Sequence, residues 1–260
     1  MQMDGDHRFV FEHDGIRHDV YRDGSGPGVL LMHELPGMSQ QCIDVADRLM
    51  ARGFSPYLPL FFGHPRQNNK LAGAAGTAWL CVRGEMNALS SNAPSKIAVW
   101  LRTLCRRMLS ECGGKGVGVI GMCLTGHLVI SVMLDESVLV PVMCEPSVPL
   151  RAKTTERKAA VGVPAEDLAR AAQRQLPVLG FRFATDTECP PQRFETLQGA
   201  FGACFRGESI PTGPNHPGNI PKEAHSVLTK YYVDEPDHPT RKAFDKIVER
   251  LETLRRRVTC

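Results

Sequence analysis

Residues 117–127 read VGVIGMCLTGH and form the most informative stretch of the chain. A short apolar run enters Gly121, a cysteine follows at position 123, and small residues lead into an apolar helical segment. This order is typical of a strand-to-helix elbow, in which a nucleophile occupies a strained turn and its neighbours must be small. The amides at the start of the helix favour a thiolate and a developing oxyanion. The alternative is an inert buried cysteine between a strand and a helix, and the motif alone does not choose between them.

The same alternation of apolar runs and amphipathic segments continues on both sides of this elbow. Ser39 is a predicted N-cap, and Pro164 suits a first helical turn. Strands are predicted at 28–32, 54–62, 117–120, 138–143, 177–183 and 205–210, and helices at 39–52, 95–112, 124–134, 154–175, 193–201 and 244–254. Strands separated by helices indicate a doubly wound, mostly parallel α/β sheet flanked by helices. We expect a single domain over residues 1–260, with its core at about 28–258 and an irregular segment or lid at 63–94.

Composition excludes several classes of function. The formal net charge is +3, which gives no broad basic field for nucleic acid. The longest apolar runs are too short for a membrane span, and the polar, acidic N-terminus does not resemble a secretory signal. Nine cysteines occur singly with no CxxC pair, which favours a reducing, cytoplasmic location. The histidines form no HxH or HExxH grouping, so we expect no metal and no cofactor.

An acid and a base follow the cysteine in the order that an elbow nucleophile requires. Asp186 comes just after the predicted strand 177–183, and His225 follows an irregular loop at 211–222. Alone, Asp186 is typical of a turn and His225 of a surface or capping group. The spacings of 63 and 39 residues each leave room for one or two strand–helix units. Together the three residues predict a Cys–Asp–His triad.

A fourth signal is Glu34, which lies in the segment HELPG directly after the strand 28–32. A loop here can supply a second oxyanion-hole amide, and Leu35 is the natural donor. A carboxylate at a buried strand end is costly to leave unpaired. We therefore expect Glu34 either to face solvent or to meet a polar partner such as the Cys123 thiol or a histidine.

Together these segments resemble the dienelactone hydrolase family. The resemblance rests on HELPG (33–37), DVADRLMARGF (44–54), GMCLTG (121–126), the Asp186 turn and AHSVL (224–228), which occur in the family's order. It implies an α/β-hydrolase fold with a cysteine nucleophile. By this resemblance Cys123 is the nucleophile, His225 the base, Asp186 the orienting acid and Glu34 the glutamate beside the thiol. The amides of Leu35 and Leu124 would form the oxyanion hole.

The chain departs from the family's pattern at two places. Thr125 occupies a position where family elbows usually have glycine, and a β-branched residue is expected to crowd the turn. The family also presents arginines to a substrate carboxylate, and Lys230 is the first cation after His225. Arg83 and Arg206 are candidate anion binders, although a surface role is favoured for both, and His216 is a candidate pocket residue. Dienelactone itself is therefore a doubtful substrate.

The predicted activity is hydrolysis of an ester or lactone bond in a small activated molecule, through an acyl-enzyme thioester. A competing hypothesis is a redox-sensing or ligand-binding relative that keeps the fold and a reactive thiol but has lost turnover. Ester cleavage separates the two, whereas thiol reactivity does not. A nucleotide-binding protein is not favoured, because GxxxxGK[ST] is missing from the sequence and the one GxGxxG match, at 116–121, overlaps the predicted strand 117–120 instead of following a strand. We expect a monomer or small homo-oligomer that binds a small-molecule substrate.

Overall fold

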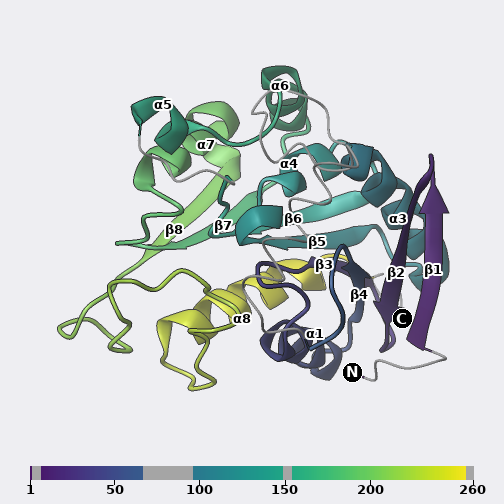
Figure 1. The fold of residues 1–260 in the computed structure, drawn as a ribbon, viewed down its shortest axis with the longest axis horizontal. Coiled ribbons are helices and arrows are strands. Elements are labelled where there is room, and N and C mark those ends of the chain that lie inside the picture. Colours follow the sequence, from purple (N-terminus) through teal and green to yellow (C-terminus); the bar gives the residue numbers. More distant parts are fainter. Residues whose placement is uncertain (2–6, 67–95, 149–153, 256–260) are drawn as a thin grey trace, which may run out of the picture.

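One sheet of eight strands runs through the molecule (Figure 1), which the computed structural model describes at residues 1, 7–66, 96–148 and 154–255. The strand order is β1-β2-β4-β3-β5-β6-β7-β8, and every pairing from β4 to β8 is parallel. The strands are β1 (Arg8–His13), β2 (Ile16–Arg22), β3 (Gly28–Met32), β4 (Ser55–Leu60), β5 (Val117–Met122), β6 (Val138–Cys144), β7 (Val178–Phe183) and β8 (Phe205–Ile210). The predicted α/β class with a mostly parallel sheet is confirmed.

The central strands are apolar throughout because helices cover both faces of the sheet. All residues of β3 and β5 are buried, so their sequences GVLLM and VGVIGM read as continuous runs rather than alternating ones. The predicted strand 28–32 coincides with β3, and the remaining predicted strands match β4 to β8 within two residues at most boundaries. Continuous apolar runs therefore located the parallel part of the sheet.

The hairpin of β1 and β2 is an addition that the sequence analysis did not predict. Asp14 and Gly15 make its turn with φ values of 51° and 73°, and β2 pairs antiparallel with β4. Two consecutive positive φ angles are typical of the tight turn that Asp-Gly favours. β1 alternates between exposed and buried positions, so it has no apolar run. The prediction placed the first strand at Gly28 for that reason.

The helices divide into two groups, one on each face of the sheet (Figure 1). α1 (Gln40–Ala51) and α8 (Pro239–Glu252) cover one face, and Ser39 caps α1 as predicted by accepting the Cys42 amide. The other face carries α3 (Lys96–Cys112), α4 (Leu128–Val132), α6 (Ala165–Gln173) and α7 (Pro191–Phe201). Each face has its own apolar core. No helix among the described residues is long and apolar enough to cross a membrane.

Two predicted helices are interrupted in the structure. The segment 124–134 splits into a single 3₁₀ turn, η2 (Cys123–Thr125), and the short α4. The segment 154–175 splits into α5 (Thr155–Ala159) and α6, with Pro164 immediately before the first residue of α6. Another 3₁₀ turn, η3 (Gly202–Cys204), joins α7 to β8. Most of the predicted lid at 63–94, including Arg83, lies outside the described residues.

Candidate active site

Cys123 sits in a strained turn at the carboxyl end of β5. Its φ is 49°, a left-handed value that a residue with a Cβ adopts at a cost, and only 6% of its surface is exposed. A Cβ on Gly121 would lie 2.5 Å from the carbonyl oxygen of Thr125. A Cβ on Gly126 would lie 2.7 Å from the Cα of Pro146. The small residues at these two positions are therefore required by the close approach of backbone on both sides of the turn.

Thr125 does not crowd this turn, contrary to the expectation from the sequence. Its side chain is buried, and its Oγ1 accepts the Met122 amide at 3.1 Å. The Oγ1 also lies 3.0 Å from the Met122 carbonyl and 3.1 Å from the Met32 carbonyl, either of which can accept its proton. Thr125 therefore ties the elbow to the end of β3, the neighbouring strand. The turn has room for it because Gly126, one residue later, makes the close contact instead.

Asp186 and His225 meet as the sequence predicts. His225 Nδ1 lies 2.8 Å from Asp186 Oδ2. The other carboxylate oxygen accepts the amides of Glu188 at 2.8 Å and Cys189 at 3.1 Å, so the acid is held from its own loop. An Nδ1–H that donates to the carboxylate leaves Nε2 with a free lone pair. The imidazole is thereby oriented to act as a base.

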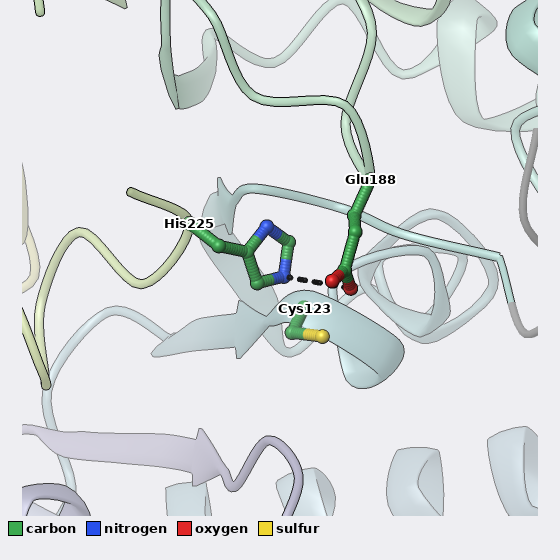
Figure 2. Close-up of side chains that lie close together, drawn as sticks. All are labelled: Cys123, Glu188 and His225. Carbon is green, nitrogen blue, oxygen red and sulfur yellow. Dashed lines mark ion pairs between the residues drawn. The ribbon is translucent and has the colours of Figure 1, made fainter. Parts of the chain in front are cut away.

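The thiol and the imidazole are close but not hydrogen-bonded. Cys123 Sγ, His225 Nε2 and a carboxylate oxygen of Glu188 all lie within 4.8 Å of one another. Figure 2 shows the three side chains close together. The sulfur instead contacts Ser147 Oγ at 3.2 Å, and Nε2 has no hydrogen-bond partner in the described part of the chain. Nucleophile and base are often looser than hydrogen-bonding distance before substrate binds.

The surroundings of His225 favour its charged form. Burial, the largest influence, lowers its pKa, but the negative charge at Cys123 and the hydrogen bond to Asp186 outweigh burial and raise the pKa above its usual value. A negative charge close to an imidazolium stabilises the protonated ring. The arrangement thus suits proton transfer from sulfur to His225.

The carboxyl group of Glu34 is buried, and its hydrogen bonds within the described residues go neither to the thiol nor to a histidine. Its Oε2 accepts Ser226 Oγ at 2.7 Å, and its Oε1 accepts the hydroxyl of Thr229. The expected polar partner is therefore a pair of hydroxyls on the loop that carries His225. Glu145 acts in the same way from the end of β6, where its Oε2 accepts the Val227 amide at 3.1 Å. We call these two carboxyl groups and the loop residues 226–229 the base-loop clamp.

Burial raises the pKa of both acids of the clamp. For Glu34 the hydroxyl donors Thr229 and Ser226 partly offset this effect of burial. For Glu145 the neighbouring Glu34 adds to burial, and the pKa lies well above its usual value. Glu145 is fully buried, and its Oε1 lacks a partner within the described residues. Two buried carboxyl groups so close together favour a state in which at least one is neutral.

Two buried arginines hold the loop that carries Asp186 and Glu188. Arg182 donates to the carbonyls of Cys189 at 2.7 Å, Ala184 at 3.1 Å and Asp186 at 3.4 Å. Arg193 donates to the carbonyls of Glu188 at 2.7 Å, Pro146 at 2.8 Å and Ala160 at 2.6 Å. Guanidinium groups offer five donors in a planar fork, which suits several carbonyls at once. These contacts fix the acid relative to the elbow.

His33 and His127 are buried histidines outside the triad. His33 Nε2 accepts the Phe61 amide at 3.2 Å, so its Nδ1, 3.1 Å from the Glu34 carbonyl, carries the proton. Burial lowers the pKa of each histidine to about 4. Both are therefore neutral at pH 7, and neither is placed to serve as the base.

The remaining predicted residues differ in how near they lie to the elbow. Leu124 follows Cys123 in η2, and Leu35, 38% exposed, lies in the turn after β3, so both are near the elbow. His216 is exposed in the loop after β8. Arg206 is the second residue of β8 and is exposed, whereas Cys123 and Asp186 follow the opposite, carboxyl ends of their strands. The oxyanion-hole and substrate-binding roles of these residues stay predictions.

The chain is similar to one known protein family over most of its length. The sequence profile of the dienelactone hydrolase family matches residues 19–203, more than two thirds of the chain. The chain belongs to the dienelactone hydrolase family. Cys123 and Asp186 lie within the matched segment, and His225 lies beyond its end. No curated protein sequence matches the chain.

Solved structures of dienelactone hydrolases and esterases share the fold. A cold-adapted esterase from an Arctic intertidal metagenomic library has a TM-score of 0.63 at 19% identity, with 94% of this chain and 93% of that chain covered. A protein from Klebsiella pneumoniae provisionally assigned as a dienelactone hydrolase has a TM-score of 0.62 at 14% identity, covering 94% and 97%. A dienelactone hydrolase-like promiscuous phosphotriesterase from metagenomic libraries has a TM-score of 0.60 at 15% identity, covering 94% and 97%. At these identities the comparison establishes the fold alone.

Sequence reasoning missed Glu145, Glu188 and the two buried arginines. Glu145 had a usable signal, because a charged residue directly after a buried strand is unusual. Glu34 lies in a similar position, two residues after the end of β3. Arg182 also had one, since a lone cation inside the apolar run VLGFRF is unusual. Glu188 and Arg193 had none, because nothing in the surrounding sequence distinguishes them from surface charges. In this member of the dienelactone hydrolase family, the two missed residues in or directly after a buried strand thus had a sequence signal, whereas Glu188 in the loop after β7 and Arg193 in α7 had none.

Proposed function

We propose that this dienelactone hydrolase family member cleaves an ester or lactone bond of a small activated substrate through Cys123, His225 and Asp186. The observation that carries the proposal is the placement of His225 between two groups. Its Nδ1 is bound to Asp186 at 2.8 Å, and its Nε2 lies within 4.8 Å of the sulfur of a cysteine in a strained turn. That arrangement matches the roles of nucleophile, base and orienting acid.

The reaction begins with transfer of the thiol proton to His225 Nε2. The Cys123 thiolate attacks the carbonyl carbon, and the carbonyl oxygen becomes an oxyanion that the amides of Leu35 and Leu124 stabilise. Each such donor is worth about 3 kcal/mol in comparable sites. Collapse of this intermediate breaks the carbon–oxygen bond to the leaving group, which takes the proton from His225 as it departs. A thioester between Cys123 and the acyl group remains.

Hydrolysis of the thioester completes the cycle. His225 removes a proton from water, the hydroxide formed attacks the thioester, and the same oxyanion site holds the second intermediate. The sulfur leaves and regains the proton from His225, and the carboxylic acid is released. Because a thiolate is a better leaving group than an ordinary alkoxide, enol esters, aryl esters and lactones are the substrates expected to acylate the enzyme fastest.

The test is hydrolysis of a panel of aryl esters, enol esters and lactones by the purified, reduced protein beside Cys123→Ala. Turnover is expected for the wild type and not for Cys123→Ala or His225→Ala, both of which should keep the wild-type circular dichroism spectrum. Asp186→Asn should lower kcat by a factor on the order of 10⁴, as loss of the orienting acid does in other triads. The panel includes an aryl phosphotriester because one structural neighbour is described as a promiscuous phosphotriesterase.

The competing function is a sensor or ligand-binding protein without turnover. Hydrolysis that survives in Cys123→Ala would overturn the mechanism. If neither the wild type nor Cys123→Ala hydrolyses any substrate, and Cys123 of the wild type is still alkylated readily, the sensor is favoured instead. In that case oxidation of Cys123 by peroxide should persist until a thiol reductant is added.

A further inference from the structure

Three different metal-binding atoms lie close together at the candidate active site. They are the Sγ of Cys123 at the elbow, the Nε2 of His225 on its loop, and a carboxylate oxygen of Glu188 on the loop after β7 (Figure 2). All three lie within 4.8 Å of one another, and the Nε2 and Oε2 atoms are 3.7 Å apart. The acyl-transfer mechanism uses Cys123 and His225 but gives Glu188 no role.

The donor set and its spacing fit a zinc ion. Zinc prefers four ligands in a tetrahedron and takes thiolate, imidazole and carboxylate together. With zinc–ligand bonds of about 2.0–2.3 Å, ligand atoms in a tetrahedron lie about 3.3–3.8 Å apart. The Nε2–Oε2 separation already falls in this range, and the sulfur needs a shift of about 1 Å at most by the same geometry. Glu188, whose side chain is 63% exposed, is free to follow the ion.

The groups behind these ligands also match a metal site. His225 presents Nε2 because its Nδ1 is bound to Asp186, and a carboxylate behind a ligating imidazole fixes its tautomer and orientation. Asp186 is itself held by the amides of Glu188 and Cys189. Nε2 is buried and lacks a hydrogen-bond partner among the described residues, so a ligand there would satisfy it.

We propose that Cys123, His225 and Glu188 form a reversible zinc site that competes with acyl transfer. On binding, one sulfur–metal bond, one nitrogen–metal bond and one oxygen–metal bond form, and the single proton that Cys123 and His225 share is released to solvent. Water fills the fourth position. With the sulfur lone pair and the Nε2 lone pair both bound to the ion, the protein lacks a nucleophile and a base. The sequence predicted no metal because the three ligands are 65 and 37 residues apart and form no local motif.

The binding test uses reduced protein freed of metal with a chelator and titrated in a calorimeter with Zn²⁺. One ion is expected per chain. Glu188→Gln should weaken binding at least tenfold, since even loss of a group behind a ligand costs about 10–100-fold in metal affinity. Glu195→Gln, an exposed residue on α7 outside the cluster, is the matched control and should keep wild-type affinity.

A second readout identifies the sulfur ligand. Cobalt(II) replaces zinc and should give a sulfur-to-cobalt charge-transfer band in the wild type that disappears in Cys123→Ala. A band of equal strength in Cys123→Ala, or equal zinc affinity in Glu188→Gln and the wild type, would overturn the site. These outcomes are measured without substrate, so they leave the proposed hydrolysis standing.

Competition with hydrolysis is tested separately and rests on the proposed function. Zinc at saturating concentration should abolish ester turnover, and excess chelator should restore it fully. Half-inhibition in Glu188→Gln should need at least about tenfold more zinc, in line with its weaker binding. Full ester turnover under conditions in which calorimetry shows one zinc ion bound per chain would mean that the ion does not block Cys123, and it would overturn the proposed competition.

Discussion

The turn that carries Cys123 is held largely by its neighbours in the chain, whereas the loop that carries His225 is held by side chains 82 to 195 residues away. At the elbow, Thr125 bonds the backbone of Met122, three residues earlier. At the base-loop clamp, Glu34 and Glu145 reach residues 226, 227 and 229 from the ends of two other strands. Contacts between near neighbours in the chain therefore contribute to the elbow, whereas the contacts of the clamp all join residues distant in sequence.

This difference determines how each half should fail. The elbow depends on small residues, so it should break when volume is added. The clamp depends on buried carboxyl acceptors, so it should break when acceptors are removed. Three substitutions test this contrast, and a fourth examines a buried histidine next to the elbow.

The largest effect is expected for Gly121→Ala at the elbow. The new Cβ would lie 2.5 Å from the Thr125 carbonyl and 2.7 Å from Val129 Cγ2, so backbone must move. The free energy of unfolding should fall by about 3 kcal/mol, and ester turnover should drop to the level of Cys123→Ala. Gly199→Ala on α7 is the control, because its Cβ meets nothing within 4 Å and a helical alanine should stabilise by up to about 1 kcal/mol. Equal behaviour of both variants in urea unfolding would refute a steric requirement.

Glu34→Ala should break the base-loop clamp while leaving the elbow intact. The hydroxyls of Ser226 and Thr229 lose their acceptor, which should cost about 1–3 kcal/mol of unfolding free energy. Displacement of His225 by about 1 Å should lower kcat for ester hydrolysis about 100-fold. Glu12→Ala, on exposed β1, is the matched control. Unchanged kcat in Glu34→Ala would mean that the loop is positioned without the clamp.

Thr125→Val should lower the free energy of unfolding by a smaller amount. The crowding expected from the sequence gives no reason for this loss. Valine keeps the shape but removes the bonds to the backbone of Met122 and Met32, at a cost of about 1–2 kcal/mol in unfolding free energy. Thr125→Ser keeps the hydroxyl and should remain within about 1 kcal/mol of the wild type. Denaturant melts of the two variants distinguish a bonding role from crowding, because relief of crowding would make Thr125→Ser more stable than the wild type.

The smallest effect concerns pH and His127, which follows the elbow. Burial lowers its pKa to about 4, against about 6.5 in the unfolded chain. Between these values the unfolded state binds a proton that the folded state does not, so stability rises with pH. From pH 6.5 down to 5.5 this residue alone should cost about 1 kcal/mol. In His127→Gln the loss of stability over that interval should be smaller than in the wild type by this amount, and an identical loss would contradict a buried neutral His127.

Much of this protein follows from its sequence because the underlying forces act over short distances along the chain. A strand covered on both faces must be apolar at every position, so β3, β5 and β6 appear as uninterrupted runs. A strained turn needs small neighbours, so Gly121 and Cys123 stand out from the order of residues alone. The meeting of Cys123 and Asp186 is then expected from the sheet, since residues that follow the ends of parallel strands gather at one edge. His225 comes after both in the chain, as an elbow nucleophile requires.

Only the tertiary structure decided what surrounds these three residues. Glu34 could have faced solvent, the thiol or a histidine, and it binds the hydroxyls of Ser226 and Thr229 instead. Thr125 was expected to crowd the turn, and it bonds the neighbouring strand. Glu188 gave no sequence signal, yet it completes a three-ligand cluster. Such contacts join residues that are distant in sequence, and their choice of partner depends on which loops pack together, so no local pattern encodes them.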